Sequence, residues 1–249
     1  MSGVKAGAMR RRAGRAFLSA ATALLGWHLV VWLTGAPDFI LPGPLDVGRA
    51  LHANAALLLA QAGFSAVNLV QGLALGVVLG VATALNLALS PAARLFLRPV
   101  LIFAQAVPVF ALAPVITLWL GYGAPSKIVM VALVTYFPIA SAFFDGLMRL
   151  PPGLADLAQV SGAGPVRRLI HLQIPHALPA LASGLRLAAV YAPLAVVIGE
   201  WVGASRGLGH LMLMSSGRGQ TDLMFASLMV LAALSLSLWA AIEALARRF

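Results

Sequence analysis

The sequence predicts an all-α membrane protein with six transmembrane helices, and three observations support this fold class. Hydrophobic residues make up 61% of the 249 residues, charged residues make up only 10%, and the mean hydropathy is +0.96. A soluble domain of this composition would leave apolar surface uncovered on every side, whereas a polytopic membrane protein places that surface against lipid. The apolar residues also form long runs, and Lys and Arg lie mostly at the ends of these runs.

The same composition excludes several classes of function. The formal net charge of +10 does not indicate nucleic-acid binding, because the cations flank apolar runs and form no aromatic-rich basic face. The chain has no cysteine, which excludes disulfides, thiolate metal sites and cysteine nucleophiles. Its five histidines are scattered over different elements without metal-ligand spacing, so we predict neither a metal site nor a cofactor.

The chain begins with a basic segment, residues 1–15, which we expect in the cytoplasm, ahead of a membrane domain at residues 16–249. Residues 16–34 carry no charge and form the first predicted span. A secretory signal peptide is the alternative, because it also combines a basic start with an apolar run. Its apolar region has about 7–15 residues, however, and this run is closer to the ~20 residues of a span.

The second span is predicted at residues 63–89, after a Pro-rich outer loop and an amphipathic surface helix at residues 47–62. Gly72, Gly76 and Gly80 recur every four residues within this span. Small residues at that spacing let helices approach closely in lipid, so we interpret them as a packing face.

The third span, residues 100–121, contains Pro108 and Pro114, each of which removes a backbone donor and bends a helix. Kinked spans are tolerated where neighbouring helices or a cavity satisfy the freed carbonyls, which makes this span a candidate wall of a pathway. Gln105 lies almost one turn before Pro108 and either faces the same cavity or makes an interhelical hydrogen bond.

Three more spans are predicted, at residues 128–144, 178–199 and 223–245. Tyr136 lies inside the fourth span and is a further pathway candidate. Glu200 follows the fifth span beside an interfacial tryptophan, at the start of a polar, Gly-rich outer segment. It is either a gate or substrate contact near the outer mouth, or the partner of Arg206 or Arg218 in a salt bridge.

The distribution of positive charge predicts the orientation of these spans. Of the 17 Lys and Arg residues, 13 lie at or near the inner side in this arrangement, and four lie outside, namely Arg49, Lys127, Arg206 and Arg218. Cytoplasmic loops carry an excess of Lys and Arg, so both termini are predicted in the cytoplasm. The same count places the polar insert between the fourth and fifth spans in the cytoplasm.

That insert, residues 156–175, has the sequence DLAQVSGAGPVRRLIHLQIP. We expect two short helical pieces with a break at residues 162–165, because Gly frees the backbone and Pro165 suits a first helical turn. The second piece carries basic residues and an apolar stripe, as expected of a segment that lies flat outside the bilayer and contacts a partner.

The insert resembles the EAA signature of permease subunits in binding-protein-dependent ABC importers, which reads E-A-A, three residues, G, nine residues, I-x-L-P. Asp156, Leu157, Ala158 and Gly162 match the first half, and residues 172–175, LQIP, match the second, with the spacing kept. Asp replaces Glu, Leu replaces the first Ala, and Leu and Ile exchange places at the end. The coupling loop of the family corresponds to residues 152–176 here. The resemblance assigns ATPase coupling to Asp156, Leu157, Ala158, Gly162, Ala163, Gly164, Arg167, Leu172, Ile174 and Pro175.

This resemblance implies a type I ABC importer permease fold in the bacterial inner membrane. It also implies three partners: a separate ABC ATPase subunit, a periplasmic substrate-binding protein, and a second permease copy in a homodimer. The chain itself contains no G-x-x-x-x-G-K-[ST] motif, so we expect a non-catalytic subunit that depends on the ATPase for energy.

The substrate is predicted less directly. Residues 37–51 and residues 199–222 resemble the branch of the family that imports nitrate, sulfonates, taurine and thiamine-precursor pyrimidines, and the pyrimidine permeases are the nearest. Alkanesulfonate, taurine or nitrate is the alternative. An ATP-independent secondary transporter or channel is a more distant alternative, and an intramembrane enzyme lacks a recognisable catalytic set.

Overall fold

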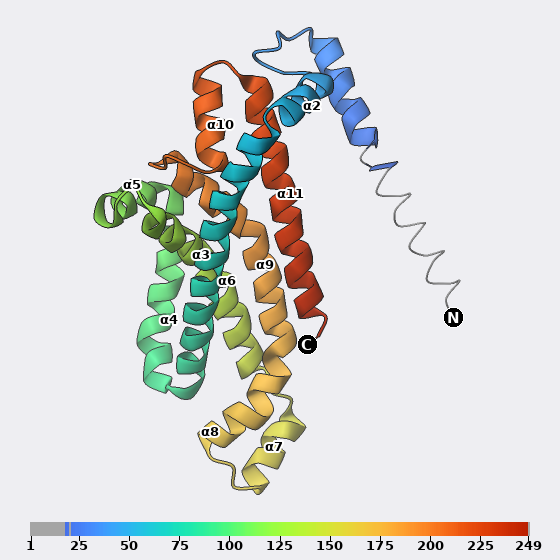
Figure 1. The fold of residues 1–249 in the computed structure, drawn as a ribbon. Coiled ribbons are helices and arrows are strands. Elements are labelled where there is room, and N and C mark those ends of the chain that lie inside the picture. The colour runs from blue at the N-terminus through green and yellow to red at the C-terminus, as the bar shows by residue number, and fades with distance from the viewer. Residues whose placement is uncertain (1–17, 20, 249) are drawn as a thin grey trace.

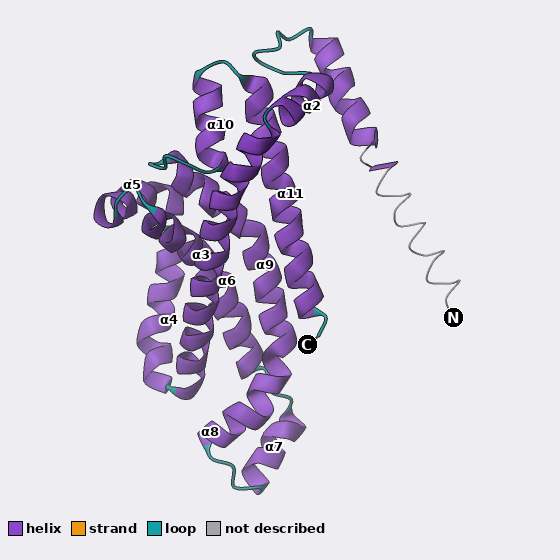
Figure 2. Ribbon diagram, in the orientation of Figure 1, coloured by secondary structure: helices purple, strands orange, loops and turns teal. Residues whose placement is uncertain are grey.

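The computed structural model describes residues 18–19 and 21–248, and within helix α4 it leaves out the side chains of residues 101, 102 and 104–106. Every regular element among the described residues is a helix (Figure 2). The longest helices run side by side, with α2 and α10 at one end and α7 and α8 projecting beyond the other (Figure 1). The all-α fold class predicted from composition is therefore confirmed.

Helices α3 (Ala55–Leu89) and α6 (Ala124–Met148) pack closely along the glycine stripe. A Cβ at Gly72 would lie 2.5 Å from Val131 Cβ, and a Cβ at Gly80 would lie 3.0 Å from Ile139 Cγ2. A Cβ at Gly76 would overlap the Thr135 hydroxyl. The predicted packing face is thus confirmed, and α6 is the helix that it contacts.

Helix α9 (Ile174–Trp201) covers the other side of α6. Gly146 on α6 faces Ala177 and Ala180, and Gly184 on α9 lies against the Pro138 carbonyl. Small residues therefore bring these two helices together at two separate levels, which leaves little room for one to slide past the other.

The predicted third span is wrong as a single helix, because two helices occupy this stretch. Helix α4 (Pro91–Ala106) begins directly after Ser90, whose hydroxyl accepts a 3.1 Å hydrogen bond from the Ala93 N–H. Val107 and Pro108 are extended, and α5 (Val109–Leu120) follows. The residue before a proline disfavours the helical region, and Pro108 has no N–H to continue the helix, so the chain breaks there instead of bending.

The predicted surface helix is also too long, and the second span too short. Helix α2 (Pro44–Ala53) ends at Asn54, and α3 begins at Ala55. Asn54 leaves the helical region (φ −110°, ψ 19°), and its side chain donates a 3.0 Å hydrogen bond to the Ala50 carbonyl. Eight residues that were expected on the surface, 55–62, therefore belong to the long helix α3.

The remaining helices complete the bundle. Helix α11 (Thr221–Ala246) lies along α9, where Arg186 donates a 2.6 Å ion-paired hydrogen bond to Glu243. The apolar helix Ala21–Thr34, which precedes α2, contacts α11 through Trp27 and Phe225, whose stacked rings have centroids 5.7 Å apart. The basic segment, residues 1–15, lies outside the described residues.

Four helical stretches in the described chain are long and apolar enough to cross a membrane, namely α3, α6, the continuous stretch Pro165–Trp201, and α11. Ala21–Thr34 and α5 are shorter apolar helices. The membrane class is therefore supported, and the count of six spans stays a prediction.

Candidate functional site

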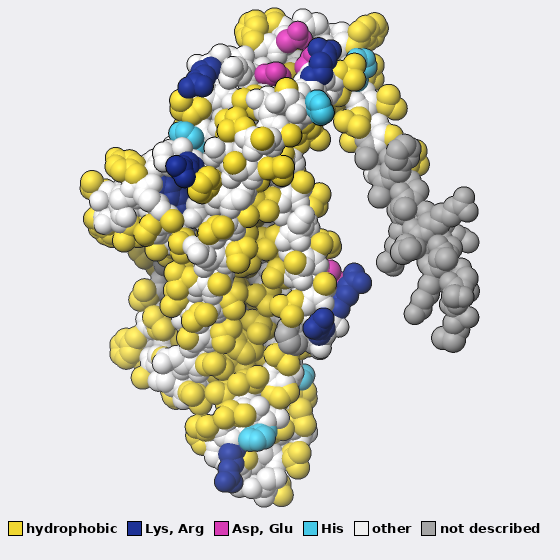
Figure 3. Space-filling model, in the orientation of Figure 1, with side chains coloured by type: hydrophobic (Ala, Val, Ile, Leu, Met, Phe, Trp, Pro, Cys, Tyr) yellow, Lys and Arg dark blue, Asp and Glu magenta, His cyan; other side chains and the backbone are white. Residues whose placement is uncertain are grey.

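The predicted coupling insert projects from the end of the bundle as two short helices. Helix α7 (Pro152–Val160) and helix α8 (Pro165–Arg168) are joined by a turn, and a π-helical turn, Leu169–Gln173, leads into α9. Figure 3 shows basic and histidine side chains beside hydrophobic ones on this tip. The break predicted at residues 162–165 is confirmed.

Backbone geometry explains why glycine occupies the turn. Gly162 has φ +61°, a left-handed conformation that Gly adopts without steric cost. Its N–H donates to the Gln159 carbonyl at 3.1 Å, and the Ala163 N–H donates to the Ala158 carbonyl at 2.9 Å. This pair of hydrogen bonds is a Schellman motif, which ends α7 and turns the chain toward α8. A Cβ at Gly162 would meet no atom within 4 Å, so the turn is open to a partner.

The tip exposes apolar side chains that no other part of the described chain covers. Val160 is 88% exposed, and Leu157, Val166 and Ile170 are each more than half exposed. Exposed apolar side chains that gather at one place mark a surface that binds another molecule. The tip projects beyond the ends of the long helices, so these side chains are free to contact a separate molecule (Figure 1).

The residues predicted to couple to an ATPase divide into an exposed and an inward set. The exposed set forms the outer surface of the tip and comprises Asp156, Leu157, Gly162, Gly164, Arg167 and Pro175. The inward set comprises Ala158, which is buried, and Ala163, Leu172 and Ile174, which are half-buried. The structure thus brings all ten positions into one projecting unit.

Two contacts attach this unit to the bundle. The Gln173 side chain donates a 3.0 Å hydrogen bond to the Leu147 carbonyl at the C-terminal end of α6. Leu169 is buried in an apolar cluster with Phe143, Phe144 and Ala177. A displacement of the tip therefore acts on both α6 and α9.

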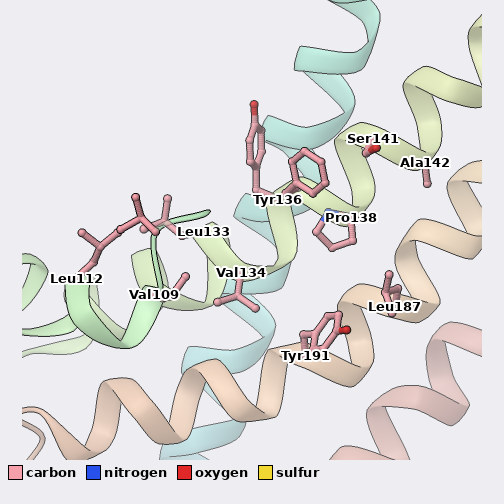
Figure 4. Close-up of a pocket in the computed structure, with 12 residues that line it drawn as sticks. Val109, Leu112, Leu133, Val134, Tyr136, Pro138, Ser141, Ala142, Leu187 and Tyr191 are labelled. Carbon is pink, nitrogen blue, oxygen red and sulfur yellow. The ribbon is translucent and has the colours of Figure 1, made fainter. Parts of the chain in front are cut away.

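A second candidate site is a groove of about 660 Å³ between α5, α6 and α9 (Figure 4). Its walls are mostly apolar, and no Asp, Glu, Lys, Arg or His occurs among the residues that line it. Hydroxyl groups come from Tyr136, Ser141 and Tyr191. Pro138 also lines the groove and cannot donate to the Val134 carbonyl one turn earlier, which leaves an acceptor on the same wall.

The four predicted pathway residues lie in different places. Tyr136 lines the groove, and its hydroxyl donates a 3.0 Å hydrogen bond to Thr83 Oγ1 on α3. Pro108 is the exposed residue between Val107 and Val109, which both line the groove. The Gln105 side chain lies outside the described residues.

Glu200, the fourth pathway candidate, is only 1% exposed and does not line the groove. Its carboxylate accepts a 2.7 Å hydrogen bond from the Ser65 hydroxyl and another of 2.7 Å from the Gly209 N–H. The ion pair considered from the sequence, with Arg206 or Arg218, is not formed in the described chain. The Arg206 guanidinium lies over the Phe64 ring, 4.9 Å from its centroid.

Sequence reasoning missed two features near Glu200. Lys127, which the charge count assigned to the outer side without any further role, is buried. The outer segment also contains an unpredicted helix, α10 (Leu208–Gly217). The apolar run that starts at Ile128 directly after Lys127 was the available signal, because a lysine at the head of a buried helix must find partners. No cluster of possible metal ligands occurs among the described residues.

A family model described as "Binding-protein-dependent transport system inner membrane component" matches residues 76–249. A "Probable ABC transporter permease protein" of Haemophilus influenzae is 42% identical over 97% of this chain and 98% of the relative. The "Formylaminopyrimidine transport permease protein ThiX" of Halalkalibacterium halodurans is 32% identical over 88% of each chain. The "Riboflavin transport system permease protein RibX" of Chloroflexus aurantiacus is 35% identical over 87% of this chain and 81% of the relative.

Among solved structures, an inward-facing MetNI methionine ABC transporter matches with a TM-score of 0.66. The match covers 77% of this chain and 95% of that chain at 22% identity, so it bears on the fold alone. The shared fold is that of an ABC importer permease.

Proposed function

This chain belongs to the family of binding-protein-dependent transport system inner membrane components, and from that premise we propose that residues 152–176 are the segment through which a separate ATPase drives import. The chain is an ABC importer permease. The observation that carries the proposal is the exposed apolar tip, which is fastened to both α6 and α9. In this proposal the α7 and α8 end faces the cytoplasm, and both chain termini lie on that side.

The mechanism is alternating access. Closure of an ATPase pair upon nucleotide binding displaces the tips of two permease copies, and each tip moves α6 and α9 with it. The groove between α5, α6 and α9 lies on this moving pair, so it opens to one side and then to the other. Tyr136, with Pro108 at the α4–α5 break, belongs to the pathway in this proposal, and Gln105 is a further candidate, whereas the buried Glu200 does not line the groove.

A second copy would complete the pathway. Helix α5, which forms one wall of the groove, exposes Phe110, Leu118 and Trp119 to the surroundings. The groove is accordingly one half of a larger enclosure between two permeases. A periplasmic binding protein would deliver the solute to the opposite end of the bundle, where α2 and α10 lie.

The chemistry of the groove favours an uncharged, flat heteroaromatic solute. Its walls combine Tyr136, Phe137 and Tyr191 with hydroxyl groups and contain no charged residue. Two relatives are named for transport of formylaminopyrimidine and riboflavin, which both contain heteroaromatic rings. An alkanesulfonate, taurine or nitrate would require cationic side chains or converging N–H donors. A pyrimidine thiamine precursor is therefore the first substrate to test.

Uptake into proteoliposomes tests this function. The chain is reconstituted with the ATPase and the binding protein of the same system, and a labelled formylaminopyrimidine is supplied outside, with an alkanesulfonate as the anionic comparison. Import should require ATP, the ATPase and the binding protein together. Import by the chain alone would support a secondary transporter or channel, and ATP-driven import of the alkanesulfonate but not of the pyrimidine would support the anion alternative.

A further inference from the structure

Lys127, on the first turn of α6, is buried at the end of the bundle opposite the coupling tip. Only 2% of its surface is exposed, and it is the largest fully buried side chain in the described chain. Its ammonium group donates to the Tyr122 carbonyl at 2.9 Å, to the Gly203 carbonyl at 2.9 Å and to the Ser126 hydroxyl at 3.2 Å. An ammonium has three N–H donors, so these partners use all of them.

The three partners come from separate parts of the fold. Tyr122 lies in the turn between α5 and α6, and Gly203 lies in the loop between α9 and α10. Gly203 has φ +145°, and a Cβ there would lie 2.5 Å from the Tyr122 ring. Lys127 thus holds two outer loops in direct contact with each other and with the head of α6.

Glu200 makes the matching connection from α9 to α10. The N–H groups that begin a helix have no partner within it, and a carboxylate is a favourable acceptor for them. The first such groups of α10 bind side chains of α3 and α9: Gly207 donates to Gln61 at 2.6 Å, Leu208 to Ser65 at 2.8 Å, and Gly209 to Glu200 at 2.7 Å. Ser65 also donates to Glu200, which closes the network.

The two charged groups lie close together but do not form an ion pair in the described chain. The Lys127 stem packs against Gly199, where an added Cβ would lie 3.4 Å from Lys127 Cγ, and Glu200 follows directly. Each group is satisfied by its own hydrogen bonds, Lys127 mainly by loop carbonyls and Glu200 by Ser65 and Gly209. Removal of the Lys127 ammonium would leave two buried carbonyls without a donor, which is costly.

With this network, α6 and α9 are joined at both of their ends. At the inner end the Gln173 side chain binds the Leu147 carbonyl, and at the outer end Lys127 binds the Gly203 carbonyl. Glycine contacts hold the two helices together between these points. The pair is therefore fastened at both ends and moves as one body.

We propose that Lys127 and Glu200, with Gln61 and Ser65, form an outer latch that carries displacement of the coupling tip to α10. Lys127 and Glu200 are positioning residues, because they act through α10 and contact no solute. The inference rests on the proposed function. Without the latch, the coupling tip still binds the ATPase, but α10 no longer moves when the tip is displaced.

Two reporter positions test the latch directly. Because the chain has no cysteine, single cysteines can be introduced at Val160 on the tip and at Met214 on α10 and labelled with an environment-sensitive fluorophore. The reconstituted complex is cycled with ATP and vanadate. In the wild-type background both labels should change their emission between the resting and the trapped state.

The decisive variant is Lys127→Met, which keeps a long apolar stem and removes the three hydrogen bonds. The Val160 label should still respond, the Met214 response should be lost, and uptake should fall by about tenfold or more. Arg49→Met is the matched control, because it removes an exposed cation at the same end of the bundle and should leave both responses intact.

Ser65→Ala provides a second route if Lys127→Met does not assemble. It removes the hydroxyl that joins Glu200 to the Leu208 N–H, without leaving a charge unpaired, and should weaken the Met214 response while the Val160 response remains. A full Met214 response in either assembled variant would overturn the latch. Absence of ATP-dependent uptake in the wild-type complex would instead refute the proposed function.

Discussion

The Gln173 side chain donates a 3.0 Å hydrogen bond to the Leu147 carbonyl, and this contact joins the proposed coupling segment to the C-terminal end of α6. Leu147 lies in the last turn of α6, where carbonyl groups lack helical partners, so a side-chain amide is well suited to bind one of them. In the proposed mechanism, this contact makes α6 follow the segment when an ATPase displaces it.

Gln173→Leu should therefore uncouple the two helices at this end. We expect uptake to fall several-fold while ATP hydrolysis by the complex continues, and we expect a loss of about 1 kcal/mol in the free energy of unfolding. Gln71→Leu, at an exposed position on α3, is the matched control and should leave uptake unchanged. Equal uptake by both variants would show that the Gln173 contact transmits nothing.

Substitutions at Gly162 test two separate effects, the backbone strain of a left-handed residue and the added bulk of a large side chain. Gly162→Ala should cost about 1 kcal/mol, because a Cβ disfavours the left-handed conformation, whereas Gly162→Asn should cost less because Asn adopts it more readily. Gly162→Trp should abolish uptake and co-purification of the ATPase, since the bulk would project into the open side of the turn. Gly164→Trp adds the same bulk at an exposed position where φ is −64° and a side chain causes no backbone strain. Comparison of the two Trp variants therefore distinguishes the effect of bulk from the effect of strain. Survival of both uptake and ATPase co-purification in Gly162→Trp would rule out the coupling role.

The glycine stripe of α3 predicts a stability effect. Gly76→Val should lower the midpoint of thermal unfolding in detergent, because its Cβ would overlap the Thr135 hydroxyl and overpacking costs about 1–3 kcal/mol. Gly63→Val, where a Cβ would meet no atom within 4 Å, should leave the midpoint close to that of the wild type. An unchanged midpoint in Gly76→Val would mean that α3 and α6 pack less closely than described.

A bulky side chain in the groove should stop solute uptake without stopping ATP hydrolysis by the complex. Ser141→Trp would fill part of the space between α6 and α9, so uptake should be lost while the ATPase activity of the complex persists. Val190→Trp adds the same bulk at an exposed position of α9 that does not line the groove, and uptake should continue. The rate of uptake and the rate of phosphate release, measured on the same proteoliposomes, distinguish the two results.

Much of the fold could be predicted from the sequence because a helix that crosses a lipid bilayer needs a long apolar run with few charges. Long apolar runs gave α6, α9 and α11 within a few residues of their ends, and the turn at Gly162 followed from glycine and proline chemistry. Pro108 was expected to bend a helix and instead divides it, because Val107 also leaves the helical region. Local sequence does not distinguish these two outcomes.

Of the candidate sites, the coupling segment could be predicted from the sequence, and the groove and the outer latch could not. The coupling segment is continuous in the chain, so its spacing is visible in the sequence. The groove and the outer latch join residues that are far apart, such as Ser65 and Glu200, and only the packing of α3 against α9 and α10 brings them together. The burial of Lys127 was not predicted because its partners are mainly backbone carbonyls, which leave no signature in side-chain composition.

Cysteine accessibility at Val160 tests the central claim most directly, since the wild-type chain has no cysteine to interfere. A membrane-impermeant maleimide should modify Val160→Cys in inside-out vesicles but not in right-side-out vesicles, and assembly with the ATPase should slow that modification by about tenfold or more. Modification from the outer side, or an unchanged rate in the assembled complex, would contradict the assignment of residues 152–176 as the segment on which the ATPase acts.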